Sequence, residues 1–126
     1  HKKIPLNATG GSMYNEMDWI HEFPGAITVC DKRGIILQMN ARACEVFRDD
    51  GGAALIGKNI LDCHPSPARE KVQELLTSGG KNAYTIEKKG VQKLIYQSPW
   101  YKNGEYAGMV ELSLEIPVNM PHFIRQ

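Results

Sequence analysis

The alternation of hydrophobic and polar positions predicts two short strands near the start of the chain. Ala26–Asp31 is rich in β-branched side chains, and residues 35–39 form a second apolar run. The intervening Lys32-Arg33-Gly34 ends in a glycine, which tolerates the positive φ of a tight turn. We therefore expect a β-hairpin over residues 26–39.

Helical spacing of apolar residues predicts two helices around this hairpin. Residues 13–23, from Met13 to Phe23, read as a short amphipathic helix that ends at Pro24-Gly25. Asn40 is a natural N-cap for a second short helix that contains Phe47.

A third helix is predicted over residues 66–78. Ser-Pro at its start combines a capping residue with a proline at the first helical position, and Gly79-Gly80 ends it. Four apolar residues recur at i, i+4, i+7 and i+8 and form one buried stripe: Ala68, Val72, Leu75 and Leu76.

The rest of the chain is predicted to be β-structure. Asn82–Lys88 and residues 91–100 flank a Lys-Gly turn, and Asn103-Gly104 is the strongest hairpin signal in the sequence. In the strand that follows, the apolar set from Val110 to Ile116 alternates with polar residues, so that one face lies in the core and the other is partly wet. The fold class is therefore α+β: a five-stranded antiparallel sheet with short helices on one face and an N-terminal amphipathic helix.

The inward faces of these elements predict an apolar pocket. Its expected lining is Ile27, Val29, Leu37, Met39, Val46, Phe47, Ile60, Val72, Leu76, Tyr84, Tyr96, Val110 and Leu112. A hydrophobic or aromatic small molecule would suit such a lining. The alternative is a fully packed core without a vacancy, and the sequence does not separate the two.

Composition places the chain among ordinary globular proteins. It has 126 residues, 42% hydrophobic and 23% charged, with a net charge of +1, which fits one domain and gives no long-range attraction to nucleic acid or to an anionic membrane. Since no apolar run reaches membrane-spanning length, the cytoplasm is the expected location. We expect residues 1–12 to be a tag or flexible leader, residues 13–117 the domain, and residues 118–126 a C-terminal tail.

Several short motifs, in this order and spacing, resemble the PAS family. They are residues 23–27 (Phe-Pro-Gly-Ala-Ile), 29–31 (Val-Cys-Asp), 34–36 (Gly-Ile-Ile), 40–47 (Asn-Ala-Arg-Ala-Cys-Glu-Val-Phe), 55–59 (Leu-Ile-Gly-Lys-Asn) and 104–108 (Gly-Glu-Tyr-Ala-Gly). Residues 59–65 (Asn-Ile-Leu-Asp-Cys-His-Pro) resemble small stand-alone bacterial PAS proteins, including the PAS domain joined to hemerythrin-like modules. The resemblance implies short helices wrapped over a cupped sheet and a signalling role, but it identifies no ligand.

Specific chemistry centres on Cys63 and His64. In light-sensing PAS domains the reactive cysteine follows a Gly-Arg-Asn step directly, whereas here Ile60 follows Gly57-Lys58-Asn59, which disfavours flavin photochemistry. His64 is a candidate axial haem ligand, although a hydrogen bond within its loop is the simpler role. Cys63 is a redox candidate, with a buried inert thiol as the simpler role. No metal cluster, nucleotide fingerprint or catalytic constellation is evident, so we expect no enzyme activity.

Two functions are compatible with these features. The first is a sensory domain whose small-molecule occupancy alters its contacts with a signalling protein. The second is a ligand-free interaction module that forms a homodimer through the helix at residues 13–23 and the exposed face of the sheet. We expect any output activity to lie on another chain, or on a further part of a longer protein that contains this domain.

Overall fold

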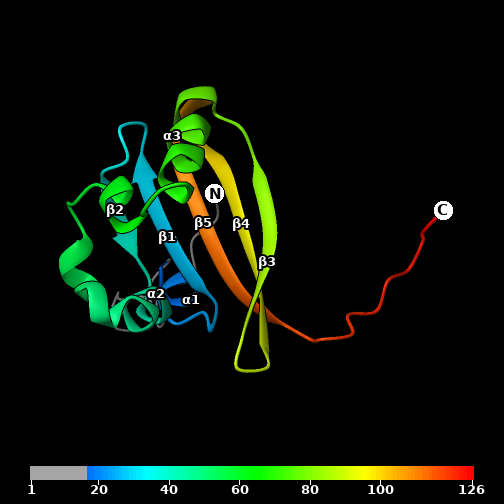
Figure 1. Ribbon diagram of the computed structural model, residues 1–126. Helices are drawn as coiled ribbons and strands as arrows, with labels where there is room; N and C mark the ends of the chain where they lie inside the picture. The colour runs from blue at the N-terminus through cyan, green and yellow to red at the C-terminus, as the bar shows by residue number, and fades with distance from the viewer. Residues whose placement is uncertain (1–16) are drawn as a thin grey trace, which may run out of the picture.

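The computed structural model describes residues 17–126, which build one five-stranded antiparallel sheet in the order β2-β1-β5-β4-β3 (Figure 1). The strands are β1 (Ala26–Asp31), β2 (Ile36–Met39), β3 (Asn82–Lys88), β4 (Val91–Lys102) and β5 (Glu105–Ile116). The helices are α1 (Asp18–His21), α2 (Ala41–Val46) and α3 (Ala68–Ser78), with the 3₁₀ turns η1 (Arg48–Asp50), η2 (Gly52–Leu55) and η3 (Ile60–Cys63) between α2 and α3. The predicted α+β class is confirmed.

A single hydrophobic core joins one face of the sheet to α2, α3 and the 3₁₀ turns. Its buried members are Ala26, Cys30, Ile36, Met39, Ala43, Leu55, Ile60, Val72, Leu75, Leu76 and Met109. The predicted stripe of α3 is buried at three positions, whereas Ala68 in its first turn is exposed. We call the side of the sheet that faces this core the inner face.

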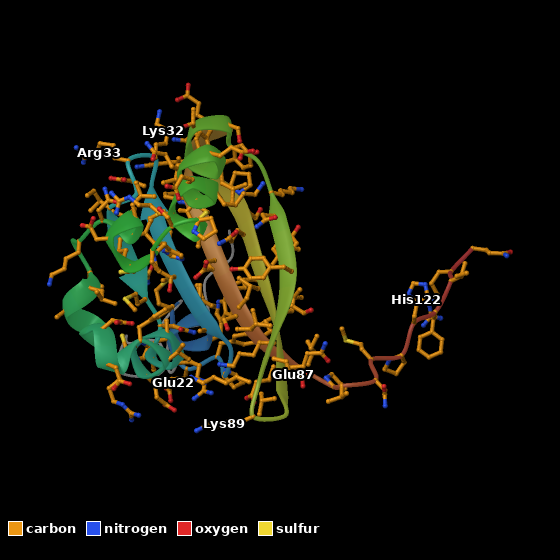
Figure 2. All side chains as sticks on the ribbon, in the orientation of Figure 1. Glu22, Lys32, Arg33, Glu87, Lys89 and His122 are labelled. Atoms are coloured by element: carbon orange, nitrogen blue, oxygen red, sulfur yellow. The ribbon has the colours of Figure 1, made fainter. Side chains whose placement is uncertain are left out.

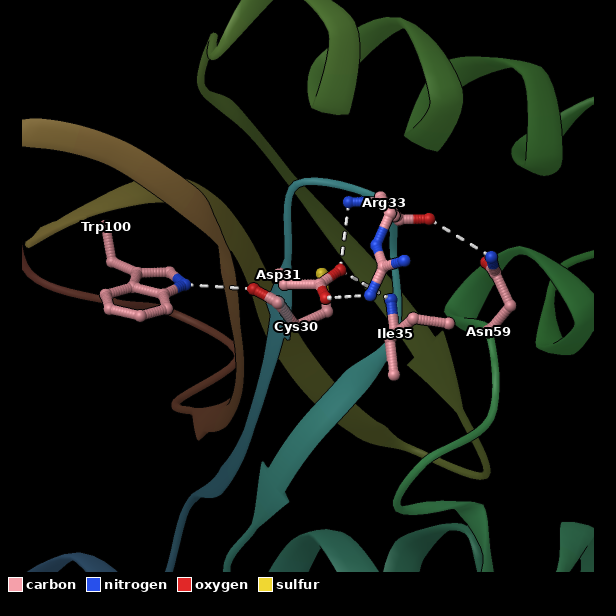
Figure 3. A network of polar contacts seen from close by, with 6 residues as sticks. All are labelled: Cys30, Asp31, Arg33, Ile35, Asn59 and Trp100. Atoms are coloured by element: carbon pink, nitrogen blue, oxygen red, sulfur yellow. Dashed lines mark hydrogen bonds and ion pairs between the residues drawn. The ribbon is translucent and has the colours of Figure 1, made fainter.

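The β1–β2 hairpin is held by the Asp31 side chain (Figure 3). Its Oδ1 accepts hydrogen bonds from the backbone N–H groups of Arg33 at 2.9 Å and Ile35 at 3.0 Å. Gly34 has a φ of +92°, as the turn requires. Asn59 Nδ2 donates to the carbonyl oxygen of Arg33 at 3.1 Å, so the turn is also tied to the segment before η3.

Asn40 caps α2 as predicted, since its Oδ1 accepts from the N–H of Ala43 at 3.0 Å. The same oxygen accepts from the N–H of Ile27 at 2.9 Å. Its Nδ2 donates to the carbonyl oxygens of Ile20 at 2.9 Å and Gly25 at 2.8 Å. One buried side chain therefore joins α1, β1 and α2.

The side chains on the inner face of β1, β4 and β5 are not the predicted ones: the alternation of inward and outward positions is shifted by one residue. Thr28 pairs with Glu111, and Glu111 pairs with Gln97; all three are buried on the inner face. Because side chains alternate along a strand, their neighbours point the other way. The predicted pocket residues that lie on the opposite, outer face are Ile27, Val29, Tyr96, Val110 and Leu112.

A tryptophan on β4 reaches across β5 to β1. Trp100 Nε1 donates to the carbonyl oxygen of Cys30 at 2.9 Å, although β5 lies between the two strands (Figure 3). Gly108 pairs with both Trp100 and Asp31, so the crossing occurs where β5 has no side chain. A Cβ on Gly108 would lie 2.0 Å from the Cys30 oxygen, which no side chain allows.

The helix at the start of the described chain is shorter than predicted, and the C-terminal residues extend beyond the sheet. Of the helix predicted over residues 13–23, the described part is helical only at Asp18–His21. Near its end, the carbonyl oxygen of Ile20 accepts a hydrogen bond from Asn40 Nδ2. Residues 1–16, which include the predicted leader, lie outside the described residues. Residues 118–126 form neither helix nor strand and run away from the sheet (Figure 1), and Figure 2 shows His122 on this extension. Within residues 17–126, no helix has the length and apolar character to span a membrane.

Candidate ligand-binding cleft

An open cleft of about 360 Å³ lies between α3 and the strands β3 and β4. Its wall consists of His64, Pro67, Ala68, Lys71, Val72, Asn82, Tyr84 and Gln97. The volume falls within the range of small-molecule sites, roughly 300 to 1,000 Å³. We call this feature the α3–β3 cleft.

A second, much smaller cavity lies deeper in the core. Its volume is about 10 Å³, and it is lined by Thr28, Ile36, Met39, Phe47, Leu55, Ile60, Cys63, His64 and Glu111. A cavity of this size holds about one water molecule. Since His64 lines both spaces, its imidazole ring stands between the cleft and this inner cavity.

A line of hydrogen-bonded polar side chains runs from the cleft toward the inner cavity. Asn82 Nδ2 donates to Gln97 Oε1 at 3.0 Å, and Gln97 Nε2 donates to Glu111 Oε2 at 2.7 Å. Gln97 is 2% exposed and Glu111 is 8% exposed. Because the carboxylate accepts, the Gln97 amide is oriented with its oxygen toward Asn82 and the cleft wall.

Tyr84 adds a phenol to the cleft wall. Burial raises the pKa of its hydroxyl, and the negative charge of Glu111 raises the pKa further. The hydroxyl therefore stays protonated at neutral pH and can donate or accept a hydrogen bond.

His64 presents one unbound nitrogen. Its Nδ1 lies 2.9 Å from the carbonyl oxygen of Ile60, which only accepts, so Nδ1 carries a proton. In the neutral ring Nε2 is then a free acceptor. The loop-bonding role expected for His64 is present. The adjoining inner cavity of about 10 Å³ is far too small for a porphyrin, so this arrangement of the core does not fit haem.

The thiols are in environments that disfavour the thiolate. Cys63 lines the inner cavity, and burial together with the charges of Asp50, Asp62 and Glu111 raises its pKa. Burial raises the pKa of Cys30 to about 11. A redox-active cysteine needs the opposite shift. Among the described residues, no group of three His, Cys, Asp or Glu side chains is arranged to hold a metal ion.

The thirteen residues predicted to line one pocket are divided by the structure among several places. Met39, Phe47 and Ile60 line the inner cavity. Val72 and Tyr84 line the α3–β3 cleft. Leu37 and Val46 are 47% and 37% exposed, and Leu76 is buried in the core away from both spaces. The other five lie on the outer face.

Sequence reasoning missed the polar part of the site. Thr28, Gln97 and Glu111 alternate with apolar residues that are predicted to face inward, and Asn82 lies on the same face of β3 as the predicted lining residue Tyr84. An alternating strand has two possible inner faces, and the prediction places the apolar face of β5 inward. Nothing in the local sequence marks the polar face as the buried one.

Solved structures resemble the chain in fold at low sequence identity. The PAS domain of BvgS from Bordetella pertussis has 21% identity and a TM-score of 0.59, over 79% of this chain and 82% of that one. The Aer2 receptor from Vibrio cholerae, a dual PAS-heme oxygen sensor, has 21% identity and a TM-score of 0.55, over 74% and 95%. The Vibrio cholerae VqmA dimer has 14% identity and a TM-score of 0.61, over 81% and 50%.

The family assignment rests on the sequence as well as on the fold. No curated protein matches this chain. The PAS fold family matches residues 18–91, which span α1 to the start of β4 and make up more than half of the chain. With sensory PAS domains as its structural neighbours, this chain belongs to the PAS family.

Proposed function

We propose that this chain is a sensory domain that binds a small molecule in the α3–β3 cleft and passes its occupancy to a protein partner through the sheet. PAS sensory domains generally have no catalytic activity of their own, which agrees with the non-enzymatic role expected here. The partner is a signalling protein of the cytoplasm, and neither nucleic acid nor a membrane surface is required.

The observation that carries this proposal is the polar line Asn82–Gln97–Glu111. It begins on β3 at the cleft wall and ends on β5 in the middle of the sheet. A ligand that competes for Asn82 or Gln97 acts directly on hydrogen bonds that join three neighbouring strands. Occupancy of the cleft is thereby coupled to the geometry of the sheet.

The mixed lining of the cleft defines the kind of ligand. Val72, Ala68 and the Tyr84 ring offer apolar surface, while the amides of Asn82 and Gln97 offer polar contacts. The wholly apolar ligand expected from sequence suits the inner cavity, but that cavity holds about one water molecule. We infer a ligand with an apolar body and at least one polar group.

A cleft-filling substitution tests the proposal. Ala68→Trp places an indole in the cleft from an exposed position, so the fold is retained, and Thr77→Trp is the control on an exposed part of the same helix. We expect native mass spectrometry of the gently purified protein to detect a bound small molecule in the wild type and in the control, but not in Ala68→Trp. A ligand retained by Ala68→Trp, or no ligand in any of the three, would contradict the proposal.

The second candidate function, a homodimeric interaction module, is favoured by the outer face of the sheet. This face carries partly exposed apolar side chains: Ile27, Val29, Leu94, Tyr96, Val110, Leu112 and Leu114. Phe23 and Leu114 converge beside Gly25, and Trp19 of α1 is 67% exposed. An apolar sheet face next to an exposed tryptophan suits a second copy of the chain.

The self-association of the outer face is tested by sedimentation velocity. We expect a dimer for the wild type and a monomer for Leu112→Lys, because a lysine on this face would be desolvated by a second copy. Leu37→Lys, at an exposed position of β2, is the control and is expected to remain dimeric. A monomeric wild type at micromolar concentration would exclude this second function.

A further inference from the structure

Glu111 is a buried carboxylate without a cationic partner. Its side chain belongs to a residue that is 8% exposed, and the only hydrogen bond it accepts from the described residues comes from Gln97. No Lys, Arg or His nitrogen of residues 17–126 lies within ion-pair distance of it. Buried carboxylates are normally paired, because removing the charge from water is costly.

The groups that face Glu111 from the surrounding elements do not neutralise it. On β3 and β4 these are the amides of Asn82 and Gln97 and the phenol of Tyr84. Before α3, Nδ1 of His64 is bonded to the carbonyl oxygen of Ile60, and neither ring nitrogen lies within ion-pair distance of Glu111. On α3, Lys71 stands at the exposed rim of the cleft, 3.7 Å from Glu74.

The inner part of the cleft wall therefore offers hydrogen-bond acceptors next to a buried carboxylate, while the positive charge of Lys71 stands at the rim. Gln97 donates to Glu111, which strengthens the amide oxygen at its other end as an acceptor. The Gln97 oxygen already accepts from Asn82, whereas Nε2 of His64, on the same wall, has no partner among the described residues. Glu111 lies behind this wall and lines only the inner cavity, so its charge acts on the cleft at a distance, through Gln97. That charge disfavours an anion in the cleft and favours a nitrogen cation.

We propose that the α3–β3 cleft selects ligands that carry a cationic nitrogen, or an N–H donor of comparable strength, on an apolar body. This inference rests on the proposed function, since it names the chemical class of the ligand for the same cleft. Glu111 acts through its field and through Gln97, so it is a specificity-determining residue. Anionic ligands of similar shape are rejected.

Three probes of nearly equal shape test the charge preference: benzamidine, benzamide and benzoate, which are cationic, neutral and anionic at pH 7. Binding is followed by ¹H–¹⁵N chemical-shift titration of the wild type. We expect benzamidine to shift resonances around Asn82 and Gln97 and to bind about tenfold more tightly than benzamide, with no saturable binding of benzoate.

Two glutamate substitutions on the same strand identify the source of the preference. Glu111→Gln removes the buried charge and is expected to equalise benzamidine and benzamide. Glu115→Gln removes an exposed charge four residues on and is expected to leave the preference intact. Equal binding of all probes by the wild type, or a preference that survives in Glu111→Gln, would overturn the inference.

The outcomes separate this inference from the proposed function. If benzamide or benzoate binds in the cleft as well as benzamidine does, the cleft is a ligand site and the cation preference is wrong. If none of the three probes shifts a cleft resonance, the preference is wrong as well. The proposed function then depends on the co-purified ligand and its loss in Ala68→Trp.

Discussion

The amide of Asn40 bonds five backbone groups, in α1, β1, α2 and the segment between α1 and β1, while the residue is only 2% exposed. Its capping role follows from a local rule, because an asparagine before a helix accepts from the N–H three residues on. Its bonds to Ile20 and Gly25 span 20 and 15 residues of sequence, and no local pattern predicts them. At the scale of single residues, short-range polar contacts are therefore predictable and long-range ones are not.

Removing this side chain is expected to destabilise the fold strongly. Asn40→Ala loses the cap and leaves buried donors and acceptors unpaired, which costs about 3 kcal/mol in the free energy of unfolding. Asn40→Asp keeps the accepting oxygen and is expected to retain the cap but to lose the bonds to Ile20 and Gly25. Urea denaturation followed by circular dichroism measures both. A loss below about 0.5 kcal/mol for Asn40→Ala would show that water replaces these bonds.

Cys30 gives the protein a specific alkaline sensitivity. Its pKa is raised from 9.0 to about 11 in the folded state, so the folded protein holds the proton that the unfolded chain releases. The stabilisation is complete below pH 9 and is lost as pH rises through 11, by about 2 kcal/mol. Cys30→Ala should lack this part of the pH dependence. Denaturation curves from pH 8 to 11 measure the difference, and parallel slopes for the two proteins would contradict it.

At the scale of elements, the strands and helices were predicted better than the directions of their side chains. Ala26–Asp31 and Asn82–Lys88 have the predicted bounds, because β-branched runs and turn glycines are local signals. The face of β5 was assigned wrongly, because an alternating strand has two possible phases and the buried set includes Glu111. Buried polar residues are typical of functional sites. A prediction that assigns only apolar residues to the interior therefore misses them.

The close approach of the β1 backbone makes the glycine at position 108 of β5 indispensable. Gly108→Ala would place a Cβ 2.0 Å from the Cys30 carbonyl oxygen, and we expect a loss of at least about 3 kcal/mol. Gly104→Ala is the matched control: its φ of +83° is also positive, but nothing lies within 4 Å of the added carbon, so only the strain of about 1 kcal/mol remains. Thermal unfolding compares the two, and equal losses would show that the contact with β1 relaxes freely.

At the scale of the whole molecule, basic side chains stand at both ends of the sheet. Figure 2 shows Lys32 and Arg33 at the β1–β2 turn and Lys89 at the far end of the β3–β4 hairpin. The whole sequence has a net charge of +1, so neither sign of charge dominates the molecule. Composition alone gives this balance, because a count of charged residues needs no knowledge of the fold.

The bond from Trp100 to Cys30 has a mechanical consequence for the sheet. Three adjacent strands are clamped at one end, where an indole bridges the outer two across the middle one. The bond thus adds a side-chain tie to the backbone ladders that join these strands. The first residues of β1 are in turn joined through Asn40 to α1. A continuous set of hydrogen bonds therefore connects β4, which carries Gln97 of the cleft wall, with the N-terminal helix of the described chain.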